Sequence, residues 1–119
     1  TLRYLYLGGR IGKAKHLVAS LLNIKPLIGM QDGVIVALGT ARSRLKAYRR
    51  MGDLIQQRFG EGARLKAAFT HVLAQEQMEK LQAIITNRFE CVEVLTGELS
   101  PALAVHTGPG TVGISVIPA

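Results

Sequence analysis

The chain has 119 residues, the length of one domain that can bury a core of its own. Its 15 lysines and arginines exceed its 8 acidic residues, which gives a formal net charge of +7. No apolar run approaches the ~18 residues of a membrane-spanning helix, and nothing resembles a secretory signal. The one cysteine excludes an internal disulfide or a thiolate metal cage. We therefore expect a single cytoplasmic domain without a membrane span.

Charge is distributed unevenly along the chain. Residues 1–50 contain ten lysines and arginines and one acidic residue, whereas residues 51–119 contain five and seven. Such an excess predicts an anionic partner for the first half, which could be a nucleic acid, an acidic protein surface, or a small phosphate or carboxylate ligand. A solvated basic face explains the same pattern, so the charge alone leaves the choice open.

The first part of the chain is expected to form two helices followed by a β-hairpin. The stretch TLRYLYLGGR places Leu2, Leu5 and Tyr6 on one helical face and ends in two glycines, which tolerate the backbone of a helix C-terminus. The stretch KAKHLVASLLN repeats apolar residues at helical spacing and predicts the second helix. Two apolar runs, residues 25–30 and 34–38, flank an Asp-Gly pair, which favours a hairpin turn because both residues tolerate positive φ.

The rest of the chain alternates helices with strands. Apolar residues at helical spacing predict a helix from Ser43 to Phe59, which Gly60 ends. RLKAAFTHV is expected to be a strand, AQEQMEKLQAIITNRF a helix, and CVEVL and TVGISVI two further strands. Strands that alternate with helices indicate an α/β fold, and the hairpin makes the sheet mixed rather than purely parallel. The predicted fold class is α/β, with helices packed on a mixed β-sheet in two layers.

Motifs for catalysis are weak. The stretch YLGGRIGKAK brings glycines close to lysines, but it matches neither the Walker nor the dinucleotide-binding pattern, and a corner between two helices explains it better. His16 and His71 lack a second ligand at metal-binding spacing, and the four serines lack a nucleophile-elbow context. We therefore expect no catalytic residue, no metal site and no cofactor.

The segment HTGPG, residues 106–110, is the strongest candidate for binding a ligand. The glycines around Pro109 open the backbone near His106 and Thr107 and let another group approach closely. An imidazole and a hydroxyl can each donate a hydrogen bond to a carboxylate or phosphate oxygen. A ligand-binding loop and a structural histidine satisfied within the core are both consistent with this pattern.

Four stretches in order, LRYLYLGGRIGKAK, SLLNIKPLI followed by DG, FTHV before a helix, and AVHTGPGTVGISV, resemble one family. Together they are similar to the carboxy-terminal half of the DegV family of bacterial fatty-acid-binding proteins, from residue 2 to about residue 117. The resemblance implies a two-domain protein in which an amino-terminal α/β domain and residues 1–119 close over one long-chain fatty acid. The chain begins without Met, in a stretch typical of the interior of an element, so we expect a fragment.

The resemblance implies a carrier rather than an enzyme. The bound carboxylate would be presented to a separate fatty acid kinase, which transfers phosphate from ATP to give an acyl phosphate. His106 and Thr107 would hold the carboxylate, and the backbone of Gly108 and Gly110 would form the loop. The residues expected to line the acyl chain are Leu22, Ile24, Pro26 and Ile28, and those expected to dock the kinase are Arg10, Arg42 and Arg44.

Two other function classes compete with this interpretation. A basic nucleic-acid-binding module fits the charge, but single-strand binders stack bases on aromatic side chains, and this chain has no Trp, three Phe and three Tyr. An oligomeric interaction domain without a ligand would explain the apolar surface. In a fragment, the surface meant for the missing domain would be exposed, so self-association is expected.

Overall fold

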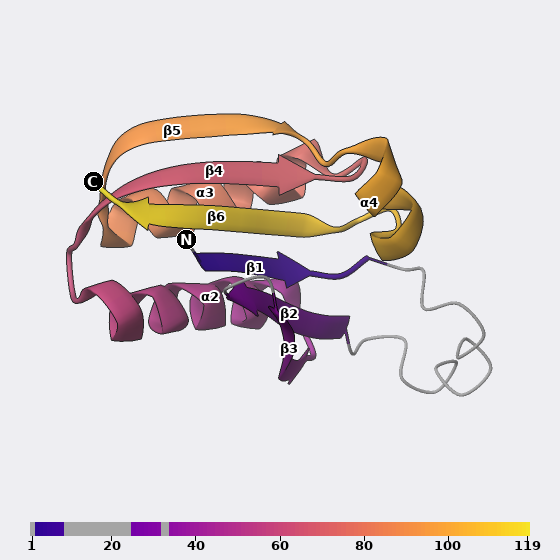
Figure 1. The fold of residues 1–119 in the computed structure, drawn as a ribbon, viewed down its shortest axis with the longest axis horizontal. Helices are drawn as coiled ribbons and strands as arrows, with labels where there is room; N and C mark the ends of the chain where they lie inside the picture. The colour runs from indigo at the N-terminus through magenta and orange to yellow at the C-terminus, as the bar shows by residue number, and fades with distance from the viewer. Residues whose placement is uncertain (1, 9–24, 32–33) are drawn as a thin grey trace.

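The computed structural model describes residues 2–8, 25–31 and 34–119, which contain six strands and three helices (Figure 1). The strands are β1 (Leu2–Tyr6), β2 (Lys25–Gln31), β3 (Val34–Ala41), β4 (Arg64–His71), β5 (Glu90–Glu98) and β6 (Val112–Pro118). The helices are α2 (Arg44–Phe59), α3 (Gln75–Arg88) and α4 (Pro101–Thr107). The sheet has the order β3-β2-β1-β6-β4-β5, with β4 and β5 parallel and all other neighbours antiparallel. The predicted α/β class and mixed sheet are confirmed.

Helices α2 and α3 cover one face of the sheet, while α4 lies at the end where β1 stops and β6 starts (Figure 1). The strand register brings Tyr4, Ile114 and Phe69 side by side on the covered face, and all three are buried. The side chains that the helices bury against this face are Ala47, Tyr48, Met51, Ile55, Met78, Leu81 and Ile85. The hydrophobic core therefore lies between the sheet and these two helices.

Helix α2 begins and ends where its sequence predicts. The Ser43 side chain accepts a hydrogen bond from the Lys46 backbone N–H at 3.2 Å, and Gly60 ends the helix with a φ of 98°. The predicted apolar stripe is buried at Tyr48 and Met51, whereas Leu45 at its margin is exposed. The cap residues thus fix the ends of the helix, and packing on the sheet selects its buried face.

The expected first helix is wrong, because its residues form strand β1. Leu2, Tyr4 and Tyr6 alternate onto the covered face, and Leu5 points to the opposite face. A short stretch that is apolar on both faces fits a helical and a strand period equally well, and pairing with β2 and β6 decides the outcome. The predicted hairpin is confirmed by the antiparallel pairing of β2 and β3. The expected second helix and the Asp-Gly pair lie outside the described residues.

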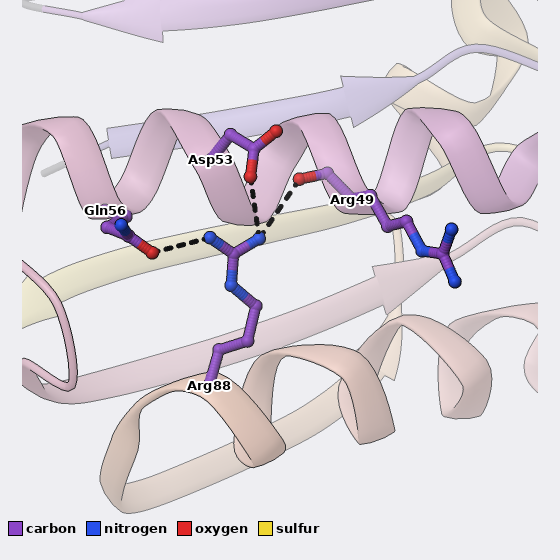
Figure 2. Close-up of polar contacts among 4 residues, drawn as sticks. All are labelled: Arg49, Asp53, Gln56 and Arg88. Atoms are coloured by element: carbon purple, nitrogen blue, oxygen red, sulfur yellow. Dashed lines mark hydrogen bonds and ion pairs between the residues drawn. The ribbon is translucent and has the colours of Figure 1, made fainter.

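Arg88 at the end of α3 clamps the two helices together (Figure 2). Its guanidinium donates to the Asp53 carboxylate at 2.9 Å, to the Gln56 side-chain oxygen at 2.7 Å and to the Arg49 carbonyl at 3.3 Å, all on α2. Gly52 lies directly beneath the guanidinium, where a side chain would crowd it. One cation therefore satisfies three acceptors on the neighbouring helix.

Removing this clamp should destabilise the protein. We expect Arg88→Ala to lower the free energy of unfolding by about 1–2 kcal/mol, because three acceptors lose a charged donor. Asp53→Asn should cost less than about 1 kcal/mol, because the carboxylate is largely exposed and the ion pair is screened by water. Urea unfolding followed by circular dichroism measures both, with Lys80→Ala on the exposed face of α3 as the control. An Arg88→Ala protein as stable as the wild type would show that the hydrogen bonds from Arg88 to α2 do not stabilise the fold.

Candidate functional site

The HTGPG segment joins the end of α4 to β6. The apolar run before it, which the sequence left without an assigned structure, forms α4, and this helix contains His106 and Thr107. Gly108 ends it with a φ of 83°, and its N–H donates to the Ala104 carbonyl at 2.9 Å. Gly110 also has a positive φ of 90°, which explains why both positions hold glycine. The backbone of His106 lies in the last turn of α4, and its side chain lies outside the described part of the chain.

Thr111 ties this loop to the end of β1. Its hydroxyl oxygen accepts a hydrogen bond from the Gly8 N–H at 2.8 Å and lies 2.8 Å from the Gly108 carbonyl and 3.0 Å from the Thr107 carbonyl, to which it can donate. The side chain is fully buried. A side chain at Gly8 would overlap the carbonyl oxygen of Pro109. Gly8 and the end of HTGPG, far apart in sequence, are therefore in direct contact.

Arg44 holds the same loop from α2. One terminal nitrogen donates to the Gly110 carbonyl at 2.8 Å, and the other donates to the Tyr48 hydroxyl at 3.0 Å. The guanidinium also lies over the Tyr6 ring, 5.0 Å from its centroid. Burial raises the pKa of Tyr48, and Arg44 offsets only part of that shift, so the phenol is neutral at pH 7. Of the residues expected to dock a partner, Arg44 is thus bonded within the domain.

The other predicted docking and histidine positions have different surroundings. Arg42 is exposed just before α2, whereas Arg10 lies outside the described residues. His71 is buried at the end of β4, and its Nδ1 accepts a hydrogen bond from the Ala74 N–H at 3.0 Å. In the described segments, no three His, Cys, Asp or Glu side chains gather closely enough to hold a metal ion. His71 therefore acts as a structural acceptor at the start of α3.

An apolar pocket of about 500 Å³ lies on the sheet face opposite α2 and α3. Its lining residues are Arg3, Leu5, Leu7, Ile28, Gly29, Met30, Ile35, Thr70, Leu99, Thr107, Ile114 and Ser115. Two predicted site residues from distant parts of the sequence, Ile28 and Thr107, meet there. Pro26 is absent from the lining, and its carbonyl accepts the Leu7 N–H at 3.0 Å. Leu22 and Ile24 lie outside the described residues.

The part of the pocket wall that β1 provides was missed from the sequence because β1 was expected to be a helix. With β1 as a strand, Arg3 and Leu5 lie on the sheet face opposite α2 and α3, the bare face. Their partners on β2, Met30 and Ile28, lie on the same face. LRYLY fits a strand period, which would place Arg3 and Leu5 on this wall, but it fits a helical period equally well. A cavity with many apolar side chains and a few polar groups from Arg3, Thr70 and Ser115 suits a ligand with a long apolar body.

A second apolar hollow of about 190 Å³ continues along the same face. It shares Ser115 with the first pocket and is lined by Leu95 and Ile117, which are 60% and 40% exposed. The Lys66 ammonium and the Glu93 carboxylate lie 3.9 Å apart at its edge. The apolar surface therefore extends beyond the first pocket along β6.

None of the helices in the described ranges is long and apolar enough to cross a bilayer.

The amino-acid sequence matches a known family over the whole chain. The family model described as an uncharacterised protein of the DegV family matches residues 1–119. The chain belongs to the DegV family. The resemblance expected from the four sequence stretches is thus confirmed. A DegV domain-containing protein of Halalkalibacterium halodurans is 34% identical over 114 residues, which are 96% of this chain and 40% of that protein. The chain spans about 40% of the length of the curated DegV relatives it matches.

Solved structures of DegV proteins share the fold. A DegV protein from Thermus thermophilus, whose structure is described as one of fatty acid binding, superposes with a TM-score of 0.77 and 28% identity over 100% of this chain and 45% of that chain. A Thermotoga maritima protein, described as revealing fatty acid binding function, has a TM-score of 0.86 and 20% identity over 99% of this chain and 42% of that chain. At that identity the second likeness concerns the fold alone.

The role of Thr111 in holding the loop is testable. We expect Thr111→Val to lower the free energy of unfolding by about 1–3 kcal/mol, because the buried Gly8 N–H loses its acceptor. Thr111→Ser keeps the hydroxyl and loses one methyl, so it should cost about 0.8 kcal/mol. Chemical denaturation of both variants measures the difference. Equal losses in the two variants would mean that packing, and not the hydrogen bond, holds this position.

Proposed function

We propose that this chain is the carboxy-terminal domain of a longer DegV protein of the cytoplasm, which binds a long-chain fatty acid and has no catalytic activity of its own. The observation that carries the proposal is the apolar pocket on the sheet face opposite α2 and α3, which reaches Thr107 of HTGPG. The Thermus relative, for which fatty acid binding is described, supports it. The acyl chain would lie against Leu5 and Ile28, and the carboxylate would lie at Thr107 and His106.

The acyl chain and the carboxylate would contribute unequally to the binding free energy. Burying about 14 methylenes at roughly 0.8 kcal/mol each gives a gross term on the order of 11 kcal/mol. One charge-assisted hydrogen bond contributes roughly 1.5–3 kcal/mol. The apolar face would therefore supply most of the affinity, and the polar groups of the loop would set which end of the ligand faces it.

A second wall is required for such affinity. Ile35 in the pocket is 61% exposed, and Leu95 farther along the face is 60% exposed. The curated relatives are more than twice as long as this chain, which leaves ample sequence for an amino-terminal domain that closes over the face. The fatty acid would then be enclosed between the two domains.

Native mass spectrometry of the longer protein, with solvent extraction, tests the binding function. We expect one bound fatty acid, and we expect His106→Ala to lose most of it. Thr86→Ala, an exposed change on α3 behind the covered face, should retain the lipid. Residues 1–119 alone should bind weakly, because half of the enclosure is missing. A longer protein that is empty and ignores added fatty acid would overturn the proposal, and submicromolar binding by residues 1–119 would overturn the need for a second wall.

The finer proposal is that a separate kinase phosphorylates the bound carboxylate. Arg42 is exposed before α2, and Lys46, Arg49 and Arg50 on that helix are exposed as well. A basic surface of this kind would steer an acidic patch of the kinase toward the ligand. Arg44 is occupied by its bonds to Gly110 and Tyr48, so Arg42 carries the docking proposal within the described residues.

Charge reversal at Arg42 tests this docking. We expect Arg42→Glu to slow acyl phosphate formation about tenfold at low salt, because a repulsive charge replaces an attractive one. The amount of bound fatty acid should stay unchanged. Lys80→Glu, the same change on the exposed face of α3, should leave the rate close to that of the wild type. Equal rates for the wild type and Arg42→Glu at all salt concentrations would remove Arg42 from the docking surface.

A further inference from the structure

We propose that Arg44 is a positioning residue for the HTGPG loop, which it holds in the geometry that distinguishes a carboxylate from an uncharged head group. The inference rests on the fatty-acid-binding function proposed above. Arg44 lines a separate hollow with His71 and Gly110, and it is absent from the lining of the apolar pocket. It would therefore act on the ligand through the loop and not by contact.

The guanidinium joins the loop to the buried core of the domain. Its two terminal nitrogens donate to different elements, one to the Gly110 carbonyl at 2.8 Å and one to the Tyr48 hydroxyl at 3.0 Å. Tyr48 is only 2% exposed, and its ring meets the Tyr6 ring edge to face at 6.2 Å between centroids. The planar fork of arginine can span two fixed acceptors, whereas the single nitrogen of lysine cannot reproduce this geometry.

The loop depends on such external bonds. Gly108 and Gly110 both have positive φ and no side chain that could pack against the core. The described bonds of the Gly110 backbone are its N–H to the Val72 carbonyl at 2.7 Å and its carbonyl to Arg44. Loss of Arg44 therefore frees the carbonyl of the peptide between Gly110 and Thr111, close in the chain to Thr107, which ends α4 and lines the pocket.

The experiment compares acids with alcohols in the longer protein. Dissociation constants are measured for palmitic and oleic acid and for the alcohols of the same chains, so that the acyl contribution cancels in each ratio. We expect the wild type to prefer the acid and Arg44→Gln to lower that preference roughly tenfold, about the effect of one charge-assisted hydrogen bond. Alcohol binding should change by less than about twofold. Arg44→Lys, which keeps the charge, should restore only part of the preference.

Two further variants separate positioning from charge and from folding. Arg58→Gln removes the same charge from an exposed site in the last turn of the same helix and should keep the wild-type preference. Tyr48→Phe removes the anchor of the guanidinium and leaves all charges in place, so it should reduce the preference partially. If Arg44→Gln does not fold, the Tyr48→Phe ratio decides the question.

The outcomes distinguish the inference from the function on which it rests. A wild type that binds neither acid, or binds acid and alcohol equally, overturns carboxylate recognition itself. A wild type that prefers the acid, together with Arg44→Gln and Tyr48→Phe proteins of unchanged preference, overturns the role of Arg44 alone. Equal weakening of acid and alcohol in Arg44→Gln would also overturn it, because that result marks general destabilisation of the pocket.

Discussion

A β-sheet with apolar side chains on both faces needs a cover on each face, and the described part of this chain covers one. Helices α2 and α3 seal the face that contains Phe69 and Val116, which are fully buried. On the other face, Ile35, Leu95 and Ile117 stay 40–61% exposed. Each Å² of apolar surface removed from water contributes about 25 cal/mol, so this face is where a ligand or a second domain gains most. The position of the pocket and the length of the relatives agree with that constraint.

The loop at the end of the pocket meets a different constraint. Glycines at positions 108 and 110 allow the turn but provide no side chains to hold it. The ties come from elsewhere in the chain: Thr111 connects the loop to Gly8, and Arg44 connects it to α2. The geometry of this turn is therefore set by hydrogen bonds from residues outside it.

An element can be predicted from the sequence when residues within or next to it determine its structure, and not when distant partners do. Helix α2 was predictable because Ser43 and Gly60 mark its ends, and β4 because its buried residues alternate strictly. The first strand was not, since LRYLY is apolar on both faces and its identity depends on partners more than 20 residues away. The turn around Pro109 was predictable from its two glycines, which both have positive φ. Its supports, Arg44 and Thr111, escaped prediction because each acts on backbone atoms, which leave no pattern in a sequence.

The two arginines on either side of Ser43 show why the number of charges in a segment does not tell which of them form a docking surface. Ser43 caps α2, so Arg42 precedes the helix and remains exposed, whereas Arg44 belongs to the first turn and reaches the Gly110 carbonyl. Both add equally to the long-range field of the basic half, because that field depends on charge and distance. They differ at contact: Arg42 can exchange water for a carboxylate of a partner, while Arg44 would first have to break two hydrogen bonds. One helix boundary therefore separates a charge suited to docking from a charge that shapes the site.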